Sequence, residues 1–443
     1  MSSYPERRAQ VLRQMHKKGG GVAILPTARE VMRNADADFP YRHDSSFYYL
    51  TGFTEPEAVL VLVAGKTDQT ILFCREKNEE REIWDGYRYG PVAARESFGF
   101  DAAFPIEQLD AEMTQLLADA PAVFYALGAD PQLDEHVRRW LNSVRSQARS
   151  GVAAPSTAID LHGMLNEMRL VKDAGEIAIM QRAADIASAA HVRAMKMARP
   201  GCHEYELEAE LLHEFRRNGS QYPAYGSIVA TGANSCVLHY RAGDAVLKDG
   251  DMVLIDAGCE LHSYASDITR TFPANGRFSG PQRDLYEIVL AAQQAAIEHT
   301  APGRHFMEGH DAAVKVLAQG MLDTGLLDRS MVGSVEDVIA KGDYRQFYMH
   351  RTGHWLGMDV HDVGDYRERE ALDTEKPWRK LQPGMVLTIE PGIYVRPAPN
   401  VPEQYWHIGI RIEDDAVVTD SGCDILTRNA PKTVADIEAL MRQ

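Results

Sequence analysis

Two aspartates stand at matching places on either side of one predicted turn. The stretch MVLIDAGCELHSYASDITRTF, residues 252–272, carries Asp256 and Asp267 on apolar segments that flank ELHS, a sequence typical of a hairpin turn. A turn centred between Leu261 and His262 would place the two carboxylates opposite each other on one buried face. Like charges so placed are destabilising unless a cation compensates them. The pattern favours a divalent-cation site, and two turn or capping aspartates remain the alternative.

A second pair of carboxylates follows later in the chain. Glu390 ends the apolar segment 385–389, and in HIGIRIE, residues 407–413, the isoleucines face one way while Arg411 and Glu413 face the other. An acid and a base on one buried face can form a plain salt bridge. If Glu413 lies opposite the Glu390 strand, however, it repeats the arrangement of the first pair. Four carboxylates would then meet in one place.

Three histidines lie between the two pairs, in HRTGHWLGMDVHD, residues 350–362. They are His350, His354 and His361, and each taken singly is more often structural than catalytic. Carboxylates with one imidazole suit oxygen-preferring divalent ions, with Mn²⁺ ahead of Zn²⁺. Two such ions about 3.5–4 Å apart would lower the pKa of a shared water to about 7 and polarise a carbonyl. A dinuclear phosphoesterase would also need cationic groups for phosphate, and Arg411 alone offers little.

The elements that must hold these residues look duplicated. KDGDMVLIDAG, residues 248–258, recurs with one gap as QPGMVLTIEPG, residues 382–392, and each copy ends an apolar strand with a carboxylate. Helices opened by Pro-Gly, over 199–215 and 301–317, precede the two copies. An old duplication predicts two similar halves that share one site, and chance similarity is the alternative.

The first part of the chain alternates strand and helix patterns. The expected elements are a helix over 5–15, buried strands over 22–26, 58–64 and 70–74, and an aromatic-rich strand or turn over 47–52. Helical periodicity dominates after about residue 165. We predict an N-terminal domain over residues 1–165 and a second domain over residues 166–443.

The composition is that of an acidic but otherwise ordinary globular chain. Of 443 residues, 47 are basic and 64 are acidic, which gives a formal net charge of −17. Nucleic acid and anionic membranes repel a negative protein, so we expect neither as a partner. Five scattered cysteines without a Cys-x-x-Cys pair argue against a disulfide framework. With no signal-peptide pattern and no bilayer-spanning apolar run, these features predict a reduced, cytoplasmic protein.

Four motifs together resemble one family. LHYRAGD, VLIDAGCELHSYASDITRTFP, HRTGHWLGMDVHD and the pair TIEPGIY with GIRIEDD are similar to those of the pita-bread metallopeptidases, from about Met168 to Leu440. YRHDSSFYYLTGFTEPEAVLVL, from Tyr41, resembles the N-terminal domain of the aminopeptidase P branch and its prolidase relatives. The resemblance implies a two-domain α+β or α/β fold. An N-terminal mixed α/β domain would precede a pseudo-twofold duplicated pita-bread catalytic domain.

The resemblance also implies a role for each acidic residue of the site. Asp256 would bind one metal ion, and Asp267 and Glu413 would bridge both. His354 and Glu390 would complete the second ion's ligands, and Glu390 would also handle the proton of the attacking water. All five positions hold residues that the family uses as ligands.

Further roles follow from the same resemblance. His239 and His361 would flank the substrate and stabilise the oxyanion, and His350 would line the proline pocket. Arg411 would hold the bridging carboxylates and the site histidines in place. Tyr394 would lie beside the leaving group.

The implied activity is hydrolysis of the N-terminal Xaa-Pro bond of peptides with proline second, by a water or hydroxide bridging two divalent ions, with Mn²⁺ favoured. A homo-oligomer, either a tetramer or a dimer, is implied as well, with Trp84 closing a neighbouring subunit's site. The nearest alternative is an Xaa-Pro dipeptidase. A pita-bread binding module without catalysis is a remote one, because such modules lose metal ligands.

Overall fold

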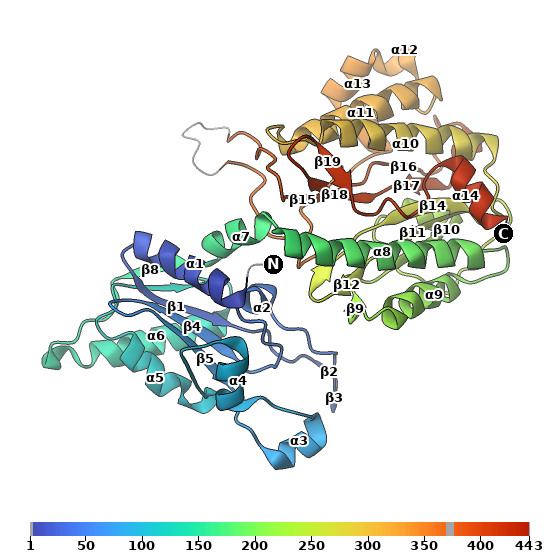
Figure 1. The fold of residues 1–443 in the computed structure, drawn as a ribbon. Helices are drawn as coiled ribbons and strands as arrows, with labels where there is room; N and C mark the ends of the chain where they lie inside the picture. The colour runs from blue at the N-terminus through green and yellow to red at the C-terminus, as the bar shows by residue number, and fades with distance from the viewer. Residues whose placement is uncertain (1–2, 369–375, 443) are drawn as a thin grey trace. The chain divides into compact units, whose positions relative to one another are not determined.

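The computed structural model describes residues 3–368 and 376–442 and contains two compact units, Met1–Met168 and Arg169–Gln443 (Figure 1). This division lies close to the boundary that the sequence suggests, between residues 165 and 166. Helix α7, His162–Leu170, includes the residues of the division. No helix in the described part of the chain is both long and apolar enough to cross a bilayer.

The first unit is built on a mixed six-stranded sheet in the order β6-β5-β4-β1-β7-β8. Its strands are β1 Gly21–Pro26, β4 Val59–Ala64, β5 Gln69–Cys74, β6 Ala102–Pro105, β7 Ala122–Tyr125 and β8 Thr157–Asp160. Its helices are α1 Tyr4–Lys17, α2 Ser45–Thr51, α3 Glu79–Asp85, α4 Gly90–Phe98, α5 Leu109–Leu116 and α6 Pro131–Arg145. A small hairpin joins β2 Met32–Asn34 to β3 Ala37–Asp38. The helix expected over 5–15 and the three predicted buried strands are confirmed as α1, β1, β4 and β5, because apolar runs of this length are buried as inner strands.

A helix replaces the strand or turn expected over residues 47–52. Helix α2 begins after Asp44, whose carboxylate accepts a hydrogen bond from the backbone N–H of Phe47 at 2.8 Å. It ends at Gly52, which has the left-handed φ of 68° that favours glycine. The expectation was wrong because it weighed the aromatic residues, which favour strands, and not the two helix caps.

The second unit consists of two similar halves. The first half contains α8 Ala174–Met197, α9 Glu204–Arg217, β9 Tyr222–Pro223, β10 Ile228–Thr231, β11 Met252–Asp256, β12 Cys259–Leu261, β13 Tyr264–Ala265 and β14 Thr269–Pro273. The second contains α10 Gly280–His299, α11 Phe306–Asp323, α12 Arg329–Val332, α13 Val335–Lys341, β15 Val386–Ile389, β16 Gly392–Val395, β17 Ile408–Arg411, β18 Asp414–Val418, β19 Cys423–Ile425 and the C-terminal α14 Val434–Met441. The strands form the sheets β10-β11-β14, β13-β12-β9, β15-β18-β19 and β16-β17.

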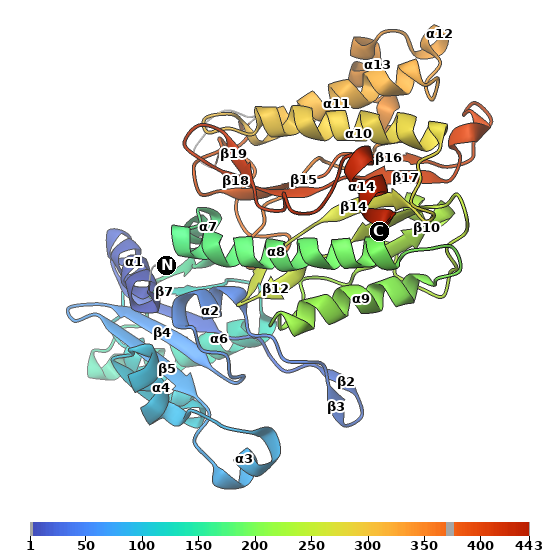
Figure 2. The same cartoon turned by 45° about the vertical axis from the view of Figure 1, so that its right-hand side comes forward.

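Helices cover the strands of the second unit from two sides. The pair α8 and α9 lies on one side and the pair α10 and α11 on the other, in both views (Figures 1 and 2). Apolar residues from both halves form one continuous core, which includes Ala187, Leu211, Ile255, Val289 and Ile410. The two halves therefore fold around a shared interior, and their strand ends can meet in one site.

The two halves differ in the register of their hairpins. In the second half Ile389 pairs with Asp414 and Gly392 with Arg411, so Glu390 and Glu413 fall opposite each other as expected. In the first half Asp256 pairs with Thr269, not with Asp267.

The expected turn of the first hairpin is therefore wrong by one residue. Leu261 pairs with Tyr264, which centres the turn on His262 and Ser263, both with positive φ. Between the strands the chain also makes a close approach at Gly258, where an added Cβ would lie 1.7 Å from the carbonyl oxygen of Ser266. The register is the same on both sides of Gly258, so the position of the turn alone makes Thr269 the partner of Asp256.

Candidate metal centre

A cavity of about 480 Å³ opens in the second unit and brings together residues that are far apart in the sequence. Its lining includes every predicted acid and histidine of the site together with the buried Arg411: Asp256, Asp267, Glu390, Glu413, His239, His350, His354 and His361. Asp256 ends β11, Asp267 lies just before β14, Glu390 follows β15 and Glu413 precedes β18. The histidines come from two loops, which follow β10 and precede β15.

Asp267, His354 and Glu413 form the tightest group. They offer ligand atoms that all lie within 4.8 Å of one another. The Nε2 atom of His354 lies 3.4 Å from Asp267 Oδ2 and 3.7 Å from Glu390 Oε1. The hydroxyl of Tyr225 joins Asp256 to this group, since it lies 2.6 Å from Asp256 Oδ1 and 2.5 Å from Asp267 Oδ1. The two hairpins thus bring four carboxylates to one place, and the loop before β15 adds one imidazole.

Arg411 ties the two pairs of acids together. Its Nη2 donates to Asp256 Oδ2 at 2.6 Å, and its Nε donates to the hydroxyl of Thr269 at 3.0 Å. That hydroxyl in turn donates to Glu413 Oε2 at 2.6 Å. The Nη1 atom donates to the hydroxyl of Tyr394 at 2.9 Å, so the tyrosine also has a fixed position.

Burial makes three acids of this cluster hard to ionise. Desolvation raises the pKa of Asp267, raises that of Glu390 to about 7, and raises that of Glu413 well above its ordinary value. For Glu413 the negative charges of Asp267 and Glu390 add to the effect. The folded chain thus holds more buried negative charge than its own cations balance, and a set of carboxylates and one imidazole fits a divalent cation.

The pKa of His354 is raised as well, but for this residue the shift favours the charged form. Burial alone would lower its pKa, but the hydrogen bond to Asp267 and the charges of Glu390 and Asp267 raise it to about 9. A protonated imidazole therefore balances part of the acidic charge. A bound divalent ion would replace that proton, because metal ligation needs a neutral imidazole.

The other predicted histidines lie around this cluster. His350 Nε2 lies 2.9 Å from the Tyr394 hydroxyl, and burial lowers the pKa of His350 to about 4. The rings of His361 and His354 are 4.3 Å apart between centroids, and burial lowers the pKa of His361 too. His239 lines the cavity in the segment after β10. Trp84 lies in α3 of the first unit, where 80% of it is exposed.

Family models match both units. Residues 178–420 match metallopeptidase family M24, and residues 4–125 match the aminopeptidase P N-terminal domain. The chain belongs to metallopeptidase family M24. The predicted two-domain fold, with an N-terminal mixed α/β domain before a duplicated metallopeptidase domain, is thereby confirmed.

Members of this family resemble the chain along almost its whole length. The Xaa-Pro aminopeptidase of Escherichia coli (strain K12) is 44% identical over 442 residues, which cover 99% of this chain and 97% of that protein. The solved structure of aminopeptidase PepP from Pseudomonas aeruginosa has a TM-score of 0.95 at 51% identity and covers 99% of this chain and 97% of its own. A zinc-substituted E. coli aminopeptidase P in complex with product has a TM-score of 0.94 at 43% identity and covers 100% and 98%.

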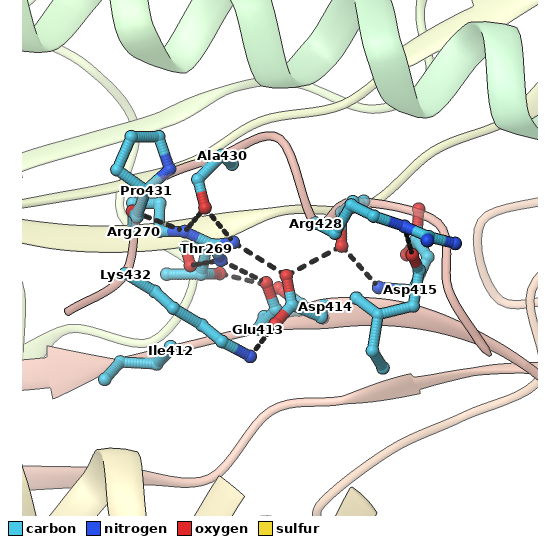
Figure 3. A network of polar contacts seen from close by, with 12 residues as sticks. Thr269, Arg270, Ile412, Glu413, Asp414, Asp415, Arg428, Ala430, Pro431 and Lys432 are labelled. Carbon is cyan, nitrogen blue, oxygen red and sulfur yellow. Dashed lines mark hydrogen bonds and ion pairs between the residues drawn. The ribbon is translucent and has the colours of Figure 1, made fainter. Parts of the chain in front are cut away.

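Behind Glu413, a largely buried group of charges supports the strand (Figure 3). Arg270 on β14 donates to the carbonyl oxygen of Glu413 at 2.5 Å and to Asp414 Oδ1 at 2.7 Å. Lys432 donates to Asp414 Oδ2 at 2.6 Å. Asp415, the next residue, accepts a hydrogen bond from the backbone N–H of Asp267 at 3.1 Å. The backbone of both proposed bridging ligands is therefore held from behind.

Sequence reasoning missed these supporting residues. Tyr225 lies in a loop whose residues follow no pattern, so nothing in the sequence singled it out. Arg270 could have been found from the sequence, because a cation in the middle of a buried strand needs a buried acid as its partner. Asp414 was visible within the GIRIEDD motif, next to a proposed ligand.

Proposed function

We propose that this chain is a metal-dependent aminopeptidase that hydrolyses the N-terminal Xaa-Pro bond of peptides. The observation that carries the proposal is the buried group of four carboxylates and one imidazole at the base of one cavity. Family membership supports it, and so do full-length relatives that bear the name Xaa-Pro aminopeptidase.

The proposed ligands are Asp256, Asp267, His354, Glu390 and Glu413, with Asp267 and Glu413 shared between two divalent ions. Mn²⁺ is the favoured ion because oxygen donors predominate, and the zinc-substituted relative indicates that related sites accept Zn²⁺ as well. Bound divalent ions lower the pKa of water to about 7 and polarise a carbonyl group.

The chain's own residues would then bind the peptide and move its protons. The Glu390 carboxylate would take the proton of the attacking water, and its buried position beside His354 keeps its pKa within reach of neutral pH. His239 and His361 would donate to the developing oxyanion, since both line the cavity that holds the acids. His350 and Tyr394, joined by their hydrogen bond, would form the wall beside proline.

This arrangement suits a bond to proline. The Xaa-Pro bond is a tertiary amide without an N–H group, so an enzyme must grip the substrate elsewhere. The free α-amine and the carbonyl oxygen are the polar groups left near the bond. Both are attracted to a cluster that combines carboxylates with cations.

We propose that the protein is a homo-oligomer, a tetramer or a dimer, in which Trp84 reaches a neighbouring copy's site. Exposed apolar side chains on the first unit support this: Met32, Phe39, Ile83, Trp84 and Tyr87 are each between 52% and 82% exposed. Light scattering would measure the mass of the assembly. A cytoplasmic location stays a prediction, which cell fractionation would test.

The activity test offers the Mn²⁺-loaded protein an Xaa-Pro-Yaa tripeptide, an Xaa-Pro dipeptide and a phosphate ester. We expect release of the first residue from the tripeptide, and loss of this release when a chelator removes the metal. An Xaa-Ala-Yaa tripeptide is the matched control for proline. Cleavage of the dipeptide alone would identify an Xaa-Pro dipeptidase instead, and hydrolysis of neither peptide would overturn the proposal.

A further inference from the structure

Two arginines line the cavity without belonging to the acidic cluster. Arg241 comes from the loop after β10 and Arg351 from the loop before β15, and both side chains are exposed. Neither forms an ion pair with any residue that the structure describes. The cavity is therefore lined both by acids and by two guanidinium groups that form no ion pair with a described residue.

Arg241 has a defined place in that wall. A Cβ added at Gly226 would lie 2.3 Å from Nη1 of Arg241, so the guanidinium lies directly over Gly226. The neighbouring residue Tyr225 has its hydroxyl between Asp256 and Asp267. The absence of a side chain at Gly226 thus leaves room for a cation close to the proposed metal ligands.

Arg351 is placed by its neighbours on the histidine loop. Its carbonyl oxygen lies 2.7 Å from His350 Nδ1, and its guanidinium carbon lies 5.3 Å from the centre of the Trp378 ring. His354 follows it by three residues. Arg351 therefore lies on the wall that carries His350, the residue proposed to line the proline pocket.

We propose that Arg241 and Arg351 form a carboxylate-binding subsite for the part of the peptide that follows proline. The inference rests on the proposed function, which orients the free amine of the substrate toward the acidic cluster. A guanidinium group binds a carboxylate through charge-assisted and often bidentate hydrogen bonds. The cavity volume of about 480 Å³ lies within the range of small-ligand sites, so one short peptide can span acids and arginines together.

The carboxylate has two sources in a peptide. In a tripeptide it is the C-terminal carboxylate, and in a longer peptide it is the side chain of an acidic third residue. Both present the same chemistry to the two arginines. The peptides used in the test must therefore distinguish the C-terminal carboxylate from the side-chain carboxylate.

The test measures KM and kcat of the Mn²⁺-loaded protein for Xaa-Pro-Ala as the free acid and as the C-terminal amide. We expect the wild type to favour the acid through a lower KM. In R241Q and R351Q, KM for the acid should rise about three- to tenfold each, with kcat and the amide's KM little changed. R329Q is the matched control, because Arg329 is an exposed arginine of α12 that lies 3.7 Å from Asp323.

A second pair of substrates tests the side-chain source. Xaa-Pro-Glu amide and Xaa-Pro-Gln amide differ in one carboxylate, and a KM advantage for the Glu peptide that the double variant R241Q/R351Q removes would assign the subsite to acidic third residues. G226A should act in the same direction as R241Q, since its Cβ displaces the guanidinium without requiring a left-handed backbone.

The outcomes separate the subsite from the function. If the wild type cleaves the peptides and the double variant keeps the wild-type ratio of KM values in both substrate pairs, the subsite is overturned and the function stands. If the wild type releases no first residue from any peptide, the function and the subsite fall together.

Discussion

Glu413 and Asp414 are neighbours in sequence, and both are buried, yet their environments are opposite. Glu413 lies among Asp256, Asp267 and Glu390, and burial together with these charges raises its pKa well above the ordinary value. Burial acts on Asp414 as well, but the charges of Arg270 and Lys432 outweigh it and lower the pKa. Asp414 has two cations of its own, whereas Glu413 shares the charge of Arg411 with Asp256.

The difference teaches how to separate a structural acid from a functional one. Successive residues of an extended chain point to opposite sides, so a single strand can present Glu413 to the cavity and Asp414 to the buried group behind it. The Asp414 group is complete as folded, with Arg270 and Asp414 both fully buried. The Glu413 group has an excess of acids, and a cation from outside would balance it, which is the property expected of a metal site.

The largest expected effect comes from removing one acid of the incomplete group. D267N should lower turnover of an Xaa-Pro-Yaa tripeptide by about a thousandfold or more, because a proposed bridging ligand and the activated water are lost together. Titration calorimetry should show weakened Mn²⁺ binding. The metal-free variant should unfold in urea within about 1 kcal/mol of the wild type, since it loses a destabilising charge. Near-full turnover in D267N would show that the site is assigned to the wrong residues.

Removing Asp414, the acid that is paired with Arg270 and Lys432, should lower the stability of the fold instead. D414N leaves Arg270 and Lys432 without their carboxylate, and breaking such a buried pair costs about 3–5 kcal/mol of unfolding free energy. E413Q is the matched control one residue away, and in metal-free protein it should be as stable as the wild type or more stable. Urea unfolding in the presence of a chelator measures both. Equal losses of unfolding free energy in D414N and E413Q would contradict the proposed difference between the Asp414 group and the Glu413 group.

The sequence was informative about one of these groups and nearly silent about the other. The proposed ligand positions stood out because carboxylates that end apolar strands are unusual and recur in the two halves. Their register in the first hairpin did not, because it depends on the turn at His262 and Ser263. The pairing of Arg270 with Asp414 and with the carbonyl group of Glu413 could not be read from the sequence either, since both lie more than 140 residues away.

His191 extends the same comparison, because it is a buried base whose hydrogen bond goes to a carbonyl group and not to an acid. Its replacement should have the smallest effect of the substitutions compared. His191 in α8 is fully buried, its Nε2 lies 3.0 Å from the carbonyl oxygen of Ala257, and burial lowers its pKa to about 4. Whereas Arg270 is charged and paired, His191 stays neutral in the fold.

That neutrality makes the free energy of unfolding depend on pH. Above pH 6.5 the imidazole is neutral in both states and contributes nothing. Between 6.5 and about 4 the unfolded chain takes up a proton that the folded chain refuses, so stability falls as the pH falls, by about 2–3 kcal/mol. H191Q keeps a donor for Ala257 but has no titratable group, and urea unfolding of metal-free protein from pH 7 to 4.5 should show a shallower loss than in the wild type. Parallel losses would mean that His191 is charged in the fold, and that an acid compensates it as Asp414 compensates Arg270.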